Sequence, residues 1–440
     1  MAATYRTAPV RTAGDPLLAA ARLAGSARFD GHVVYEGPDG YAFAGGAAAE
    51  FVLRSRTLTR TAGGRTVEEP WRGDPLEPVR AFLDGLDIAD WRAYGWCAFE
   101  LAYAVSGGGT ADDGEETVLA HLVVPRTEVR FTADGAVVRS LDPDELRAVA
   151  ALVAEPAPEP AGSGRLLAPG LAHGAAHYEQ AVDAAVGDIR DGRLQKVVLS
   201  RYVPVDEEID FVATYVAGRR ANTPARSFLL DLAGLRVTGF SPETVVEVTA
   251  DGRVASQPLA GTRALTGDAG ADRARREDLL SDPKELHEHA ISVKVAVDEL
   301  AGPCKPDTVV IQEYMTVKER GTVQHLASKV AGRLPEGGSP WDAFAAVFPA
   351  VTASGVPKHA AYERIRAHEP RRGPYAGTVL TVGADGSMDA ALVLRSVFAQ
   401  DGRTWLRAGA GVVEHSRPGR ELEETCEKLA SVARTLVARG

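Results

Sequence analysis

The chain has 440 residues, 45% of them hydrophobic, which is enough for a large core and would usually give two or three domains. Its net charge of -11 argues against a nucleic-acid or anionic-membrane partner, and a small anionic substrate would need cations of its own in the site. The three cysteines form no zinc-binding pattern, and no stretch reaches the roughly 18 apolar residues of a membrane-spanning helix. We therefore expect a cytoplasmic protein with neither a membrane nor a nucleic-acid partner.

The first 165 residues favour short strands, such as 31–35 and 118–124, separated by glycine turns and a few helices. Two stretches are typical of linkers or surface loops. Residues 107–116 are rich in glycine and acidic side chains, and residues 155–165 contain three prolines. On composition alone, these stretches suggest that the chain has two halves.

Apolar residues at helical spacing predict a helix over 178–189, with Gly192 placed to end it. A valine-rich strand is expected at 194–205, and three more strands follow closely at 227–232, 235–240 and 244–249. Turn residues at 233–234 and 251–252 separate such runs, so the pairing should be antiparallel. Strands clustered among long helices indicate an α+β fold rather than an alternating βαβ sheet.

Lys196 lies on the strand predicted at 194–205, on the same face as Leu194 and Val198. Burial between such apolar neighbours would disfavour the ammonium form, and a lysine with a lowered pKa is a usable base near neutral pH. By the strand pattern alone, an edge-strand lysine in water is the more common case.

Two helices offer acidic faces. A helix is predicted over 283–300, capped by Asp282, and it places Glu285, Glu288 and His289 on one face. The last helix, from about Gly419, has two neighbouring stripes. One is apolar (Leu422, Cys426, Leu429, Ala433 and Leu436), and the other consists of Glu421, Glu424 and Lys428. Carboxylates from two helices could hold a hard divalent cation. The alternative is that these stripes are ordinary solvated faces.

Two single residues are further candidates. Glu243 stands where one predicted strand turns into the next, and it is either a general acid or an ordinary turn carboxylate. Arg395 follows four apolar residues on an expected strand, and it is either a snorkelling edge residue or a fork for a carboxylate.

Read together, several segments resemble the chorismate-utilising family, which includes anthranilate synthase component I, aminodeoxychorismate synthase, isochorismate synthase and salicylate synthase. The matching segments run in family order across residues 178–433: 196–201, 239–243, 258–263, 284–289, 407–411 and 421–428. Before that point the resemblance is looser, although residues 96–101 look like the family's N-terminal portion. The resemblance implies one large domain over residues 1–440, with two packed, mostly antiparallel sheets and helices outside, instead of two halves.

Lys196 and residues 348–358 indicate which member of the family the chain is most similar to. Members that add ammonia carry glutamine at the position of Lys196, and members that add water carry lysine. The segment 348–358, together with 315–326 and 403–407, is closest to siderophore salicylate synthases. One departure is Gln257, where the family pattern has glutamate.

The resemblance implies that chorismate is converted to salicylate and pyruvate via isochorismate. Lys196 would activate a water that attacks C2, and Glu243 would protonate the departing C4 hydroxyl. Magnesium would be held by Glu288 and Glu424, supported by Glu285 and Glu421.

Tyr375 and Arg395 would clamp the enolpyruvyl carboxylate, and the second step would expel pyruvate by a concerted hydrogen transfer that needs no further base. The remaining substrate-binding residues implied by the family are Gly261, Thr262, His325, Thr352, Gly409, Ala410, Gly411 and Lys428.

Three rival functions follow. An isochorismate synthase would stop after the first step, and an ammonia-using subunit would need a glutaminase, which Lys196 argues against. A non-catalytic chorismate-binding relative would have lost the catalytic groups, whereas this chain retains Lys196, Glu243, Glu288 and Glu424. We expect a monomer or homodimer with no glutaminase partner.

Overall fold

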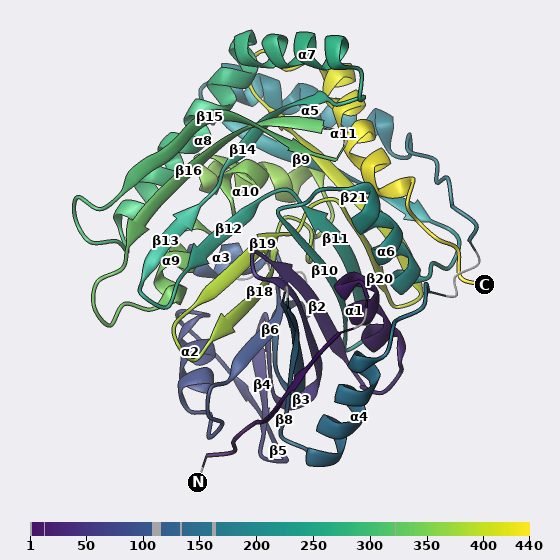
Figure 1. Cartoon of the computed structure of the whole chain (residues 1–440). Helices are drawn as coiled ribbons and strands as arrows, with labels where there is room; N and C mark the ends of the chain where they lie inside the picture. Colours follow the sequence, from purple (N-terminus) through teal and green to yellow (C-terminus); the bar gives the residue numbers. More distant parts are fainter. Residues whose placement is uncertain (1, 13, 108–115, 133, 161–163, 322) are drawn as a thin grey trace.

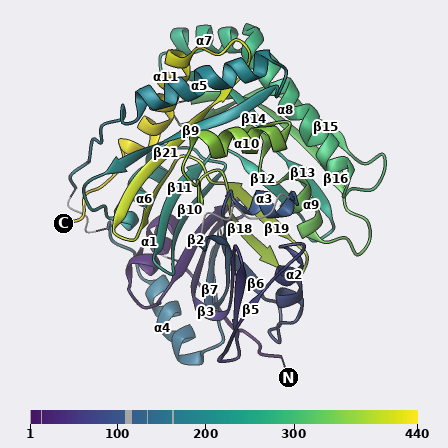
Figure 2. The same ribbon diagram turned by 180° about the vertical axis from the view of Figure 1, so that it is seen from behind.

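The computed structural model describes residues 2–12, 14–107, 116–132, 134–160, 164–321 and 323–440. The surface stretches predicted at 107–116 and 155–165 fall partly in the gaps, so their residues 108–115 and 161–163 lie outside the described residues. The two views in Figures 1 and 2 show strands in the middle of the molecule and helices around them.

The helices of the described part are α1 (Pro16–Gly25), α2 (Glu77–Asp84), α3 (Leu101–Val105), α4 (Pro143–Ala154), α5 (Ala175–Arg190), α6 (Phe211–Ala221), α7 (Ala269–Ser281), α8 (Pro283–Ala301), α9 (Pro340–Val347), the 3-10 helix η1 (Val351–Ala353), α10 (Lys358–His368) and α11 (Pro418–Ala433).

The strands up to residue 248 are β1 (Arg6–Val10), β2 (His32–Gly37), β3 (Gly40–Arg54), β4 (Thr57–Ala62), β5 (Arg65–Pro70), β6 (Arg92–Cys97), β7 (Val118–Thr132), β8 (Gly135–Ser140), β9 (Lys196–Val205), β10 (Arg226–Leu232), β11 (Leu235–Ser241) and β12 (Thr244–Val248). The later strands are β13 (Arg253–Ser256), β14 (Leu259–Ala264), β15 (Val310–Arg320), β16 (Val323–Arg333), β17 (Gly355–Val356), β18 (Thr378–Gly383), β19 (Met388–Leu392), β20 (Ser396–Gln400) and β21 (Arg403–Val412).

The strands form two antiparallel sheets that share two long strands, β3 and β7. In the first sheet the order is β17-β9-β21-β20-β11-β10-β2-β3-β7-β8-β1. In the second it is β5-β4-β3-β7-β6-β18-β19-β12-β13-β16, with β14 and β15 also paired to β16. The β3–β7 pair is irregular between Ala47 and Ala49, where each strand passes from one sheet to the other. The predicted α+β fold is confirmed.

Alternation along the strands divides the core into two layers. On β2, Val33 belongs to the large core between the sheets, whereas its neighbour Val34 belongs to the core beneath the helices. The same switch separates Phe228 from Leu229 on β10. Helices α1, α4, α6 and α11 cover the outer core, so both faces of the first sheet are buried.

The N-terminal and C-terminal portions of the chain are interleaved. Strand β2 pairs with β10 in the first sheet, and β6 pairs with β18 in the second. Residues before 165 therefore supply strands to both sheets and do not form a separate half.

The local predictions are mostly confirmed. Helix α5 spans the predicted 178–189, and Asp282 caps α8 by accepting from the amides of Lys284 and Glu285. The turn Ala233-Gly234 has two positive φ angles, which suits the two-residue hairpin between β10 and β11.

Two local predictions need correction. Arg395 is not on a strand: β19 ends at Leu392, β20 begins at Ser396, and Arg395 adopts a left-handed φ of 50° between them. The apolar stripe of α11 is not buried as a unit, because Leu422 and Cys426 are only half-buried while Glu421 is buried. In the described part of the chain, no helix is long and apolar enough to cross a membrane.

Candidate active site

One cavity brings together most of the candidate residues. Among the lining residues are Glu243, Gly261, Thr262, Glu288, His325, Thr352, Tyr375, Arg395, Gly409, Gly411, Glu424 and Lys428. They lie on or next to the strands β11, β14, β16, β20 and β21 and the helices α8, η1 and α11, except Tyr375, which lies just before β18.

Glu243 is held at the end of β11 by its own backbone. Its carbonyl oxygen accepts from the Ser241 hydroxyl at 2.8 Å and from the Leu392 amide at 3.1 Å. Its side chain is buried, and Oε1 accepts from the Thr352 hydroxyl at 2.5 Å. Burial raises the pKa of Glu243 to about 8, although the Thr352 hydrogen bond and the Lys196 charge act against the shift. The carboxyl is therefore protonated at neutral pH and is an available proton donor.

Lys196 is fully buried, so the alternative of an edge-strand lysine in water is wrong. It begins β9, whose neighbours are β21 and the two-residue strand β17. Its ammonium lies 2.9 Å from Glu288 Oε1 and donates to the Ser292 hydroxyl at 3.1 Å. Lys196 does not itself line the cavity, whereas its partner Glu288 on α8 does.

Arg395 supplies a cation to the cavity wall and rests against the neutral imidazole of His325. The Arg395 guanidinium donates to His325 Nε2, which assigns the imidazole proton to Nδ1, 3.0 Å from the Thr262 hydroxyl and 3.3 Å from the Gly261 carbonyl. Burial and the neighbouring Arg320 lower the pKa of Arg395 to about 10. No carboxylate in the described part of the chain pairs with Arg395, so its charge is left for an anion in the cavity.

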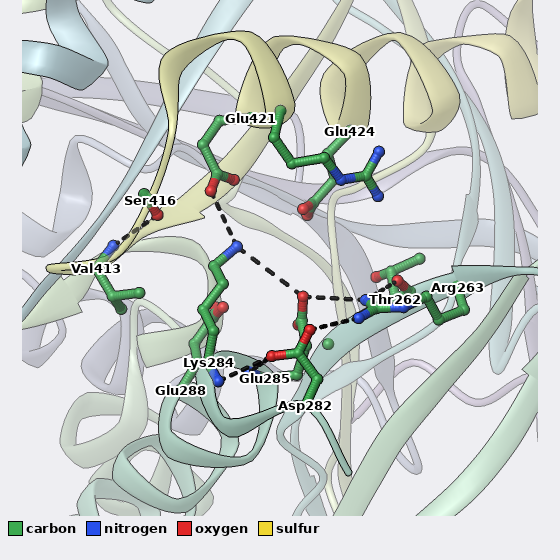
Figure 3. Close-up of polar contacts among 12 residues, drawn as sticks. Thr262, Arg263, Asp282, Lys284, Glu285, Glu288, Val413, Ser416, Glu421 and Glu424 are labelled. Atoms are coloured by element: carbon green, nitrogen blue, oxygen red, sulfur yellow. Dashed lines mark hydrogen bonds and ion pairs between the residues drawn. The ribbon is translucent and has the colours of Figure 1, made fainter. Parts of the chain in front are cut away.

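Four carboxylates face one another between the helices α8 and α11. Glu285 and Glu288 extend from α8 and Glu421 and Glu424 from α11, as Figure 3 shows. Each carboxylate has a cation nearby. Glu288 pairs with Lys196 at 2.9 Å, Glu424 with Lys428 at 2.7 Å, Glu421 with Lys284 at 2.9 Å, and Glu285 with Arg263 at 3.1 Å.

The four carboxylates repel one another despite these cations. Burial and the Glu288 charge raise the pKa of Glu285 to about 7. Burial also raises the pKa of Glu421, with Lys284 opposing and Glu424 adding to the shift. For Glu424, the charges of Lys428 and Lys284 outweigh burial, and its pKa lies below the ordinary value.

The donor set fits a hard divalent cation, although its side chains are turned to their lysine and arginine partners. In the described residues, no three acidic, His or Cys side chains are arranged around a common point as metal ligands. Yet Glu421 Oε2 is buried without a hydrogen-bond partner within the described chain, and burial together with a neighbouring carboxylate raises the pKa of both Glu285 and Glu421. A magnesium ion would supply positive charge to such carboxylate oxygens.

Two glycines let strand β21 lie close to its neighbours: Gly411 faces α8, and Gly409 faces β9. A Cβ on Gly411 would lie 2.2 Å from Glu288 Oε1, and a Cβ on Gly409 would lie 2.6 Å from the Leu199 carbonyl. The Gly409 carbonyl accepts from Lys428 Nζ at 3.0 Å. Glycine is therefore required for the carboxylate of Glu288 to occupy its position.

Four predicted residues do not line the cavity. Lys196, Glu285 and Glu421 lie behind it. Ala410 is on β21, and its side chain points to the opposite face from its two glycine neighbours. Gln257, the departure from the family pattern, is also outside the lining. Sequence reasoning missed the roles of Lys284 and Arg263 as partners of the carboxylates, and it missed Arg407 in the cavity wall. All three lie inside segments that resemble the family, namely 258–263, 284–289 and 407–411. That resemblance was the one sequence signal that could have pointed to them.

The chain matches the family model of the chorismate binding enzymes over residues 36–434 and belongs to that family, whose substrate is chorismate. A salicylate synthase of Mycolicibacterium paratuberculosis is 41% identical over 409 residues, covering 93% of this chain and 90% of that protein. Anthranilate synthase component 1 of Thermus thermophilus is 37% identical over 261 residues, covering 59% of this chain and 56% of that protein.

Solved structures show the same fold. Anthranilate synthase component I of Streptococcus pneumoniae superposes with a TM-score of 0.75 at 26% identity, covering 96% of this chain and 98% of that one. The menaquinone-specific isochorismate synthase of Escherichia coli gives a TM-score of 0.74 at 22% identity, covering 99% and 96%. The predicted single α+β architecture of chorismate-utilising enzymes is thus confirmed.

Proposed function

We propose that the protein is a magnesium-dependent salicylate synthase that converts chorismate to salicylate and pyruvate through isochorismate. The observation that carries the proposal is Arg395, a guanidinium with no acidic partner among the described residues, which shares one cavity with the carboxylates of Glu288 and Glu424. A substrate with two carboxylates could place one on Arg395 and the other on a magnesium ion held by Glu288 and Glu424. The similarity to a salicylate synthase over 93% of the chain supports the choice of product.

Glu288 and Glu424 would hold the magnesium ion, supported by Glu285 and Glu421. When bound, the ion supplies positive charge to the ring carboxylate of the substrate. Arg395 and Tyr375 would bind the carboxylate of the enolpyruvyl arm, Arg395 through its fork of N–H donors and Tyr375 through its hydroxyl. Together these contacts would fix the orientation of the ring in the cavity.

In the first step, Lys196 in its neutral amine form would take a proton from a water molecule that attacks C2, and Glu243 would donate its proton to the C4 hydroxyl as it leaves. The pKa of about 8 supports the acid role of Glu243, because the carboxyl carries a proton at neutral pH. The Thr352 hydroxyl, which donates to Glu243, would fix the direction of that proton. The second step breaks the bond between the ring and the enolpyruvyl oxygen with hydrogen transfer to the arm, and the protein holds the arm over the ring.

The test is product analysis by NMR and mass spectrometry with purified protein, chorismate and magnesium chloride. We expect salicylate, and pyruvate in equal amount by coupled lactate dehydrogenase. Isochorismate without pyruvate would support an isochorismate synthase instead. An aminated product after addition of ammonium salts would overturn the assignment of water as nucleophile.

Lys196→Gln tests the base. We expect a loss of about 10²- to 10⁴-fold in the rate of isochorismate formation, the usual contribution of a positioned acid or base. Lys294→Gln, on the exposed face of α8, is the matched control and should keep full activity. An undiminished rate in Lys196→Gln would remove this residue from the mechanism.

A further inference from the structure

Lys284 occupies an unusual position in the cluster of carboxylates. It is the second residue of α8, and its amide is fixed by the capping side chain of Asp282 at 2.9 Å. Its ammonium leaves the helix and reaches across to α11, where it lies 2.9 Å from Glu421 Oε1. It also lies 3.9 Å from Glu285 Oε1, and Figure 3 shows it between these two carboxylates.

Lys284 is the main link between the two acidic helices. Its partner Glu421 has only 1% of its side chain exposed, and Lys284 itself only 18%. The other three cations of the cluster do not join α8 to α11: Lys196 comes from β9, Lys428 pairs within α11, and Arg263 of β14 pairs with Asp278, Asp282 and Glu285. Without the Lys284 charge, Glu421 and Glu285 would lose the cation that lies near both of them, and the repulsion between the two helices would increase.

An ammonium in this position competes with a metal ion. Both cations are attracted by the same four carboxylates: Lys284 contacts Glu421 and lies near Glu285, and magnesium would be held by Glu288 and Glu424 in the same space between α8 and α11. Two cations only a few ångström apart also repel each other in a buried site. A lysine has a flexible four-carbon chain and can withdraw toward solvent when a divalent ion takes its place.

We propose that Lys284 is a built-in counter-ion that holds α8 and α11 together while no metal is bound, and that magnesium displaces it from Glu421. This inference rests on the proposed magnesium site. It assigns to Lys284 a positioning role, in which one side chain sets both the stability of the metal-free protein and the affinity for the ion.

The experiment compares Lys284→Met with the wild type by isothermal calorimetry with magnesium chloride and by thermal unfolding with and without the ion. Removing the competitor should tighten magnesium binding by about tenfold, within the usual range of coupling between two ligands. The metal-free variant should melt at a lower temperature than the wild type, and this deficit should shrink at saturating magnesium. Sodium chloride at matched ionic strength controls for screening.

Two control variants separate the explanations. Lys284→Arg keeps the charge and should retain the metal-free melting temperature of the wild type. Lys294→Met removes an exposed lysine of the same helix and should change neither the melting temperature nor the affinity. If metal-free Lys284→Met does not fold, purification with magnesium should restore it; a variant that stays unfolded with saturating magnesium would overturn the proposal.

The failures are distinguishable. If wild-type protein binds magnesium but Lys284→Met binds it with equal or lower affinity, or its melting deficit is the same with and without the ion, Lys284 is a permanent brace and the displacement is wrong. If neither protein binds magnesium, the proposed metal role fails together with the inference.

Discussion

Glu243 is the residue whose protonation state most directly links structure to a measurable rate. Its pKa of about 8 means that the proton donor is present below that pH and is lost above it. We therefore expect kcat to fall on the alkaline side with a midpoint near pH 8. Glu243→Gln should lower kcat by about 10²- to 10⁴-fold and remove this alkaline limb. A variant that kept the same limb would show that another group titrates.

Arg395 leads to a prediction in which stability and binding change in opposite directions. Its charge lies in the cavity wall with no acidic partner in the described chain, which is unfavourable until an anion binds. Arg395→Met should raise KM for chorismate while increasing the free energy of unfolding by roughly 1 kcal/mol or more. Steady-state kinetics and urea unfolding of the substrate-free protein measure the two effects. A simultaneous loss of stability would mean that Arg395 is structural.

At the scale of the element, the approach of β21 to α8 depends on Gly411. A Cβ there would stand 2.2 Å from Glu288 Oε1, so Gly411→Ala must displace that carboxylate or the strand. We expect weaker magnesium binding in calorimetry and a loss of activity. Gly187→Ala, in helix α5 with open space around its Cα, is the matched control and should be neutral or slightly stabilising. Unchanged magnesium affinity in Gly411→Ala would exclude Glu288 as a ligand.

Caps and turns were predictable from the sequence because they depend on residues that are close together along the chain. The cap at Asp282 and the turn at Ala233-Gly234 depend on residues a few positions apart, and both are confirmed. The burial of Lys196 was open because it depends on β21, β17 and Ser292, which lie far away in sequence. Arg395 was placed on a strand because four apolar residues precede it, and that run gives no sign that Arg395 itself has a left-handed φ.

The candidate site depended on more than local pattern. Acidic stripes on α8 and α11 are equally typical of solvated faces, and only the family resemblance suggested that they meet. The structure brings them together through Lys284, which no periodicity within either helix could indicate, because its contact with Glu421 spans 137 positions.

For the whole molecule, the shared strands β3 and β7 predict cooperative unfolding. Each runs through both sheets, so neither sheet can lose its order without exposing the core of the other. We expect a single transition in which near-UV circular dichroism and tryptophan fluorescence coincide during urea titration. Two separated transitions would show that the sheets are independent.

The interleaving of β2 with β10 and of β6 with β18 also bears on how such a chain can recombine. A crossover near residue 165 that joins the first part of one relative to the second part of another would cut no helix or strand of the described chain. It would nevertheless pair strands from different parents in both sheets, so the side chains that these strands bury would not match. Functional chimeras should therefore arise only between parents whose inter-sheet residues already agree, and exchange of loops on the outer surface should be far better tolerated.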